Sequence, residues 1–177
     1  MDVCEIGTAK HQLGSIIQVK PLGSLGLIDE GEADWKVIAI DINDPLASKL
    51  NDINDVQIHM PGLVESMIDW FRHYKIPAGK PANKFALNNQ NGKEFFDKNF
   101  TLKIIDHDHK SWLNLVNNNK LKNTKISILN TCLNNEHTIS ANEARLVIEN
   151  ESKINNNNLL DQDDSSIDKV NYINRNN

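Results

Sequence analysis

Residues 27–41 form the stretch Leu-Ile-Asp-Glu-Gly-Glu-Ala-Asp-Trp-Lys-Val-Ile-Ala-Ile-Asp, and this stretch decides the fold. Residues 24–28 before the central loop are small or aliphatic, and residues 35–40 after it are rich in strand-forming types. The acidic, glycine-containing segment over residues 30–33 is typical of a turn. The pattern predicts two antiparallel β-strands joined by a tight polar loop.

The predicted hairpin brings charged side chains to one end of a sheet. Side chains alternate between the faces of a strand, so Asp34 and Lys36 share a face with Ile38 and Ile40. Asp29 leaves the first strand where Asp34 begins the second. Two carboxylates and a lysine, with aliphatic side chains further along the same face of the strand, indicate a site for Mg²⁺ and phosphate. Because acidic loops are commonly only solvated surface, a hairpin without function stays an alternative.

Composition narrows the class of protein. A chain of 177 residues is long enough for one domain with a core, and its net charge of −5 argues against a nucleic-acid groove. Cys4 and Cys132 are far apart and outside any Cys-x-x-Cys spacing, which indicates neither a disulfide scaffold nor a zinc site. With no apolar run of membrane-spanning length, we expect no membrane partner and a cytoplasmic location.

The composition changes along the chain. Every Gly and Pro precedes residue 93, every Trp precedes residue 117, and the remainder is rich in Asn, Lys, Ser and Asp. Such a segment buries too little apolar area to offset its ordering entropy. We therefore expect a folded part over residues 1–116 and an Asn-rich, largely disordered or loosely draped tail over residues 117–177. Within that tail, residues 126–148 could be ordered, with a short helix over residues 141–148.

The segments on either side of the hairpin give further elements. Residues 14–20 predict a strand, followed by a bend or bulge at residues 21–23, where Pro and Gly interrupt a ladder. Residues 61–75 predict an amphipathic helix that Pro77 ends. Residues 93–116 predict a second helical region with a possible break near residues 99–101. The buried positions expected on the two helices are Leu63, Met67, Trp70, Phe71, Tyr74, Phe96, Ile105, Trp112 and Val116.

Two other acidic or histidine-containing groups could be mistaken for metal sites. Asp41 and Asp44 precede Pro45, and we interpret them as turn-forming residues. His107 and His109 lie two residues apart, and on a helix such residues diverge by about 200°, so they cannot share an ion. We interpret His109 as a packing or hydrogen-bonding residue.

Residues 29–45, Asp-Glu-Gly-Glu-x-Asp-Trp-Lys-Val-Ile-Ala-Ile-Asp-Ile-Asn-Asp-Pro, resemble the metal-binding hairpin of eukaryotic soluble inorganic pyrophosphatases. The resemblance continues through residues 61–63, 70–77 and 79–81 and covers residues 2 to about 116. It implies an α+β fold with a mainly β core, a partial OB-like antiparallel β-barrel flanked by two helices. It also implies Mg²⁺-dependent hydrolysis of pyrophosphate to two phosphates.

The same resemblance assigns roles to six residues. Asp2, Asp29 and Asp34 match metal ligands, while Lys36, Tyr74 and Lys75 match groups that bind the phosphates. Strand geometry supports Asp29, Asp34 and Lys36 independently, whereas Asp2 and Tyr74 rest on the resemblance alone. Pyrophosphate or phosphate is therefore the expected ligand. Family members commonly pair, so a homodimer is among the expected assemblies.

The family's Asp-x-Asp-Pro run, which precedes the acid that Asp2 matches, is missing here. We therefore expect a fragment, a truncated gene product or a paralogue without its front half, with weak Mg²⁺ binding and poor turnover alone. A non-catalytic pyrophosphatase-like subunit or regulator is the main alternative. An OB-type nucleic-acid binder is disfavoured by the net negative charge of the chain and by the lack of exposed aromatic residues interleaved with Lys or Arg.

Overall fold

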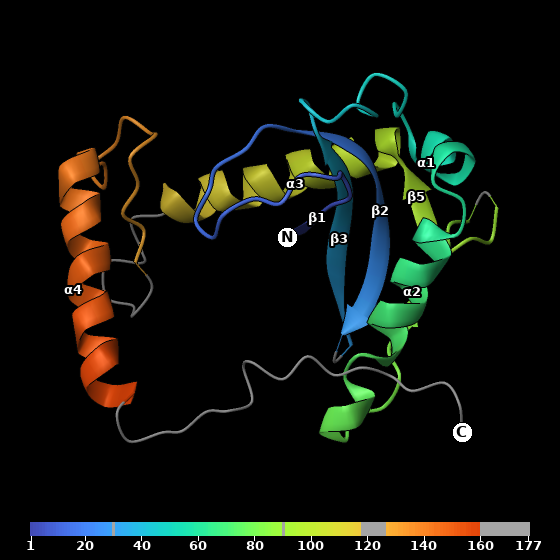
Figure 1. Cartoon of the computed structure of the whole chain (residues 1–177). Coiled ribbons are helices and arrows are strands. Elements are labelled where there is room, and N and C mark those ends of the chain that lie inside the picture. The colour runs from blue at the N-terminus through green and yellow to red at the C-terminus, as the bar shows by residue number, and fades with distance from the viewer. Residues whose placement is uncertain (30, 90, 118–126, 160–177) are drawn as a thin grey trace. The chain divides into compact units, whose positions relative to one another are not determined.

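The computed structural model describes residues 1–29, 31–89, 91–117 and 127–159, the last nine as backbone only. These residues belong to two compact units, one containing Met1–His107 and the other beginning at Asp108 (Figure 1). All six residues of the predicted site lie in the first unit. No helix within the described ranges is long and apolar enough to span a bilayer.

A long hairpin forms the centre of the first unit. Strand β2 (Val19–Asp29) pairs antiparallel with β3 (Glu32–Asp41), and the ladder runs up to the pair Asp29–Glu32. Gly31 takes a positive φ of 93° at the loop, a conformation that favours glycine. Glu32 and Ala33 belong to β3 rather than to the loop, so the loop is shorter than predicted. The hairpin itself is confirmed.

Three short strands complete a five-stranded sheet of order β1-β3-β2-β4, with β5 also paired to β2. They are β1 (Asp2–Glu5), β4 (Lys84–Phe85) and β5 (Phe95–Asp97). The α+β class is confirmed, and the described sheet does not close, so the barrel is partial. The antiparallel pairing predicted for the barrel is confirmed for β2 with β3, β4 and β5, whereas β1 runs parallel to β3.

The segment before the hairpin differs from its prediction. The strand expected over residues 14–20 begins only at Val19, because Gly14 takes a positive φ of 81° and the Ile16 side chain is fully exposed. The predicted irregularity is confirmed as a register shift between Pro21 and Gly23. A Cβ at Gly23 would lie 2.6 Å from the Phe96 carbonyl oxygen, so glycine permits this close approach.

Helices are more numerous in the described residues than in the prediction, which had two helical regions before residue 117 and a short helix over residues 141–148. They are α1 (Ile53–His59), α2 (Leu63–His73), the 3₁₀ turn η1 (Ile76–Ala78), α3 (Lys98–Val116) and α4 (Ala141–Leu159). Helix α2 begins at Leu63 rather than at residue 61. Residues 95–97 form a strand instead of helix, because Phe95 and Phe96 pair with β2 and are buried. From Lys98 onward α3 is unbroken.

Helix α4 falls within the predicted tail. It begins at Ala141, as expected, and continues beyond residue 148 to Leu159. Ser140 and Glu143 form a reciprocal cap: the Glu143 amide donates to Ser140 Oγ (3.2 Å) and the Ser140 amide to Glu143 Oε2 (2.8 Å). Residues 118–126 and 160–177 of the predicted tail lie outside the described residues. The domain boundary at residue 116 stays a prediction.

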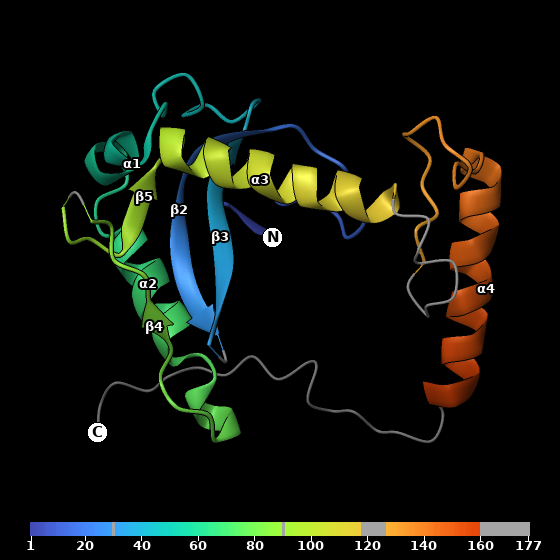
Figure 2. The same cartoon turned by 180° about the vertical axis from the view of Figure 1, so that it is seen from behind.

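The two faces of the hairpin are covered differently. One face packs on α1 and α2 and holds the main core: Leu22, Leu25, Leu27, Ile38, Ile40, Ile53, Val56 and Val64. On the other face the Trp35 ring contacts Phe96 (5.3 Å) and Phe100 (5.6 Å), beside the first turns of α3. These turns cross behind the strands in Figure 1 and in front of them in Figure 2.

The predicted buried stripe of α2 is partly wrong. Leu63, Met67 and Phe71 pack against the core as expected. Trp70 is instead 51% exposed, and Val64 is the fully buried residue of this helix. The helix is therefore turned so that Val64, rather than Trp70, faces the sheet.

Asp41 and Asp44 have structural roles, as interpreted. Asp44 accepts hydrogen bonds from the Thr8 amide and hydroxyl (2.8 and 2.9 Å) and from the Leu46 amide (2.8 Å). These bonds, the Thr8 amide first, hold the pKa of Asp44 below its ordinary value. Asp41 accepts from the Asn43 amide at 2.8 Å, which closes the turn after β3.

The interpretation of His109 as a packing residue is also confirmed. Its ring stacks on Trp112 in the second unit, with 5.5 Å between the ring centroids and 20° between the planes.

Candidate metal and phosphate site

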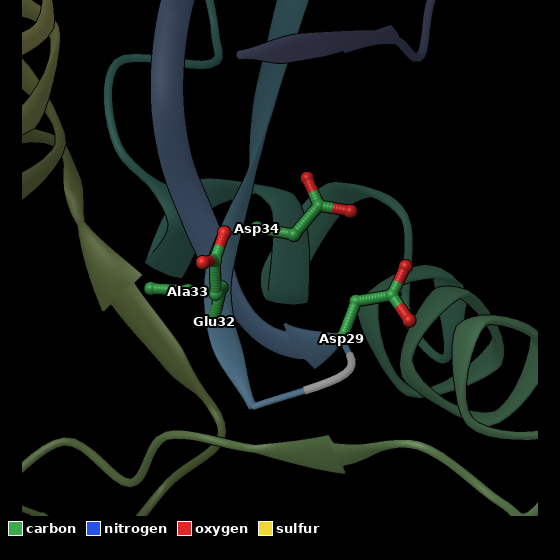
Figure 3. Close-up of a pocket in the computed structure, with 4 residues that line it drawn as sticks. All are labelled: Asp29, Glu32, Ala33 and Asp34. Carbon is green, nitrogen blue, oxygen red and sulfur yellow. The ribbon is translucent and has the colours of Figure 1, made fainter.

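Strand register places four of the predicted residues on one face of the sheet. Asp34 lies opposite Leu27 in the antiparallel ladder, so its side chain shares the face of Leu27 and Asp29. Asp2 lies opposite Lys36 in the parallel pair. This is also the face that carries the core further along the hairpin. Figure 3 shows the carboxylates of Asp29 and Asp34 pointing to one side of the hairpin, and the Ala33 side chain to the other.

Lys36 organises the first group of charges. Its side chain is only 6% exposed, and its Nζ donates to Asp2 Oδ2 at 2.5 Å and to Asp34 Oδ2 at 2.7 Å. The same Nζ lies 5.7 Å from the centroid of the Phe71 ring on α2. The buried ammonium therefore has two carboxylates and an aromatic ring as neighbours.

The ionisation of this group follows from these contacts. Burial by itself would lower the pKa of Lys36, but the hydrogen bonds to Asp2 and Asp34 outweigh it and raise that pKa above its ordinary value. The hydrogen bond from Lys36 likewise lowers the pKa of Asp2. At neutral pH the group thus contains one ammonium and at least one ionised carboxylate in direct contact.

Lys75 organises the second group. It follows Tyr74, the C-cap residue of α2, and its Nζ donates a hydrogen bond to Asp29 Oδ2. That bond, with burial opposing it and Tyr74 adding to it, raises the pKa of Lys75. The ammonium lies 5.6 Å from the centroid of the Tyr74 ring. The end of α2 is thereby tied to the end of β2.

The structure brings the six predicted residues into two neighbouring groups, Asp2–Lys36–Asp34 and Asp29–Lys75–Tyr74. Asp29 and Asp34 also line one recess of about 550 Å³, together with Glu32 and Ala33. Glu32 was predicted to lie in the turn, and it lines this recess because it pairs with Asp29 across the ladder.

The rim offers carboxylate oxygens, a ligand type that divalent metal ions such as Mg²⁺ accept. Mg²⁺ prefers hard oxygen ligands and keeps several waters, so a few carboxylates suffice. In the described part of the chain, no three His, Cys, Asp or Glu side chains are grouped closely enough to hold a metal together. Instead the carboxylates of Asp2, Asp29 and Asp34 are each hydrogen-bonded to a lysine ammonium.

Comparison with known proteins gives consistent results. Residues 1–113 match the family model described as inorganic pyrophosphatase. The inorganic pyrophosphatase of Kluyveromyces lactis is 48% identical over 147 residues, which are 83% of this chain and 50% of that protein. The Bos taurus inorganic pyrophosphatase is 53% identical over 131 residues, 74% of this chain and 44% of the relative.

Solved structures agree with the sequence matches. The inorganic pyrophosphatase from Schistosoma japonicum has 56% identity and a TM-score of 0.60, covering 64% of this chain and 38% of that one. An N-terminally truncated vacuolar soluble pyrophosphatase of Trypanosoma cruzi in complex with PPi has 46% identity and a TM-score of 0.60, covering 64% and 41%. The chain spans about half the length of the curated relatives it matches. It belongs to the inorganic pyrophosphatase family.

Proposed function

We propose that this chain binds Mg²⁺ and pyrophosphate at the end of the β2–β3 hairpin and contributes to hydrolysis of pyrophosphate to two phosphates. The observation that carries the proposal is the placement of two ammonium groups, Lys36 and Lys75, among three carboxylates at one rim. Family membership and the PPi complex of the Trypanosoma cruzi relative support the choice of ligand.

Asp2, Asp29 and Asp34 would hold the metal in this proposal. When bound, Mg²⁺ neutralises phosphate charge and lowers the pKa of a coordinated water. The lysines supply fixed positive charge: Lys36 is buried and Lys75 half-buried, and both have raised pKa values, so both stay protonated at neutral pH. Because such charges are already oriented, they need little reorganisation when an anion binds.

Tyr74 adds a phenolic hydroxyl beside Lys75. A hydroxyl can donate a hydrogen bond to a phosphate oxygen without changing the charge of the site. The proposed contribution of the protein is thus to orient and neutralise the anion, which is most of what phosphoryl transfer requires.

We propose that the 177-residue chain assayed by itself turns over slowly and binds Mg²⁺ weakly. The chain spans about half the length of its relatives, and its three site carboxylates are already engaged by lysines. We further propose a cytosolic location, where pyrophosphate-releasing reactions would supply the substrate.

A phosphate-release assay with pyrophosphate and Mg²⁺ tests this function. We expect slow release by the unmodified chain, none above background for Asp34→Ala and a strong reduction for Lys36→Ala. Glu149→Ala, which removes an exposed acid of the second unit, is the matched control and should retain the rate. Equal rates in all four proteins would refute the site, and turnover at ordinary enzyme rates would refute the slow-turnover proposal.

A non-catalytic subunit is the second candidate, and the position of β1 favours it. Among the described strands β1 pairs with β3 alone and forms an edge of the sheet, with Val3 53% exposed. Such an edge can accept a strand from another chain. Co-purification with a full-length pyrophosphatase, without phosphate release by this chain alone, would support this candidate, whereas a chain that elutes as a monomer or homodimer and is active would reject it.

A further inference from the structure

Three aromatic rings at the end of α2 form a cluster next to the site. The Trp70 ring stacks on Tyr74 with 4.9 Å between centroids and 21° between planes, and meets Phe71 edge-on at 4.9 Å. Phe71 and Tyr74 also meet edge-on, at 6.0 Å. Stacked and edge-on pairs at these distances are the favourable arrangements of aromatic side chains. We call Trp70, Phe71 and Tyr74 the aromatic cluster.

The two lysines of the site each contact one ring of this cluster. Lys36 Nζ is 5.7 Å from the Phe71 centroid, and Lys75 Nζ is 5.6 Å from the Tyr74 centroid. Both distances are within about 6 Å, the range over which a ring attracts a cation. Both ammonium groups are also hydrogen-bonded to carboxylates of the hairpin. The aromatic cluster and the hairpin thus fix the lysines jointly.

Core packing does not explain the position of Trp70 in the cluster. Phe71, Met67 and Ile68 on the same helix pack against the core, whereas Trp70 is 51% exposed. The ring contacts of Trp70 go to Phe71 and Tyr74. Its carbonyl oxygen also accepts a hydrogen bond from the Tyr74 amide at 2.9 Å. The Trp70 ring therefore holds the side chain of Tyr74 where the helix ends, whereas the backbone bond is the ordinary i−4 bond of the helix and does not depend on the Trp70 side chain.

We propose that Trp70 is a positioning residue for anion binding: it fixes the Tyr74 ring and, through that ring, the Lys75 ammonium. This inference rests on the proposed function, because it assigns Tyr74 and Lys75 to the pyrophosphate. Trp70 acts through its neighbour and is not itself placed against the anion. Replacing it should weaken binding of pyrophosphate, and should do so only while Tyr74 is present.

A double-mutant cycle measured by titration calorimetry with pyrophosphate and Mg²⁺ tests this dependence. We expect Trp70→Ala and Trp70→Leu to raise the Kd about 3- to 10-fold, the amount an aromatic pair contributes, and Trp70→Phe to stay close to the unmodified chain. In a Tyr74→Ala background, Trp70→Ala should add less than about 2-fold, because residues that act as one unit are not additive. Ile58→Ala, which removes another exposed apolar side chain (71% exposed), is the control and should leave the Kd unchanged.

A second measurement needs no ligand. In NMR spectra the Tyr74 ring protons should show ring-current shifts from the stacked Trp70 ring, and these shifts should disappear in Trp70→Ala and persist in Trp70→Phe. An unchanged Kd, or Tyr74 shifts that Trp70→Ala leaves unchanged, would overturn the inference, as would a full additive effect of Trp70→Ala without Tyr74. If the unmodified chain binds no pyrophosphate, the proposed function fails, and the Tyr74 ring shifts alone decide whether Trp70 positions this side chain.

Discussion

The two ends of the β2–β3 hairpin share one backbone ladder and one face, yet they hold opposite kinds of side chain. At one end Leu22, Ile38 and Ile40 are fully buried against α1 and α2. At the other end Asp29, Asp34 and Lys36 occupy positions of the same alternation, with Leu27 and Leu25 opposite Asp34 and Lys36. The aliphatic end is stabilised by removal of apolar area from water, and the polar end by mutual neutralisation of charges.

The residues that stabilise the fold and the residues of the candidate site thus occupy different parts of the same hairpin rather than different domains. Full burial of a Leu or Ile side chain contributes about 1.5–3 kcal/mol, whereas an ion pair with an exposed partner contributes about 0–1 kcal/mol. The side chain of Asp2 is 69% exposed and that of Asp34 34% exposed. The ion pairs of these residues with Lys36 should therefore contribute about 0–1 kcal/mol to stability, the range for ion pairs with an exposed partner. The polar end can therefore change with small effects on folding and large effects on ligand binding.

Truncation at the aliphatic end should have the largest effect on stability. Ile38→Ala opens a cavity under α1 and α2 and should lower the free energy of unfolding by about 2–5 kcal/mol. Urea unfolding followed by circular dichroism measures this change. Val3→Ala on the edge strand, where the side chain is 53% exposed, should cost less than about 0.5 kcal/mol. Equal losses at both positions would remove the distinction between core and edge.

Replacement of the buried lysine at the polar end should have a smaller effect. Lys36→Met keeps most of the volume, and Asp2 and Asp34 can turn to water, so the free energy of unfolding should change by less than about 1 kcal/mol. Pyrophosphate affinity, measured by calorimetry, should nevertheless fall strongly. Lys84→Met, at an exposed lysine of β4, should change neither quantity. A loss of stability as large as that of Ile38→Ala would show that Lys36 is part of the core.

The smallest expected effect is the pH dependence of the Lys36 pairing. The pKa of Lys36 is raised, so its contribution is present below the ordinary value of 10.5 and is lost as pH rises through the higher folded value. The pKa of Asp2 is lowered, so its contribution is present above 3.8 and is lost as pH falls through the lower folded value.

The two ends should therefore respond differently to pH. In urea unfolding at about pH 3, 7 and 11, the difference between the unmodified chain and Lys36→Met should be greatest near pH 7 and shrink at both extremes. The difference for Ile38→Ala should stay constant. A constant difference for Lys36→Met would mean that its ion pairs do not affect stability.

Much of the hairpin could be predicted because the signal is local. Alternation with a period of two places Asp34 and Lys36 on the face of Ile38 without knowledge of any partner. The turn chemistry of Asp41 and Asp44 is equally local, since hydrogen bonds two residues ahead, to Asn43 and Leu46, contribute to it. The parallel pairing of β1 with β3 could not be predicted from any local pattern. The contact between Asp2 and Lys36, which are 34 residues apart, depends on that pairing and could not be predicted either.

By itself, the sequence determined the hairpin, its charged rim and the family to which the chain belongs. Only the tertiary structure decided that Asp29 is paired with Lys75, 46 residues away, and that Val64 rather than Trp70 faces the core. It also decided that residues 95–97 add a strand to β2 rather than a turn to α3. The physical reason is that periodicity fixes which side chains share a face, whereas the partner of that face is set by competition among all elements for the same buried area.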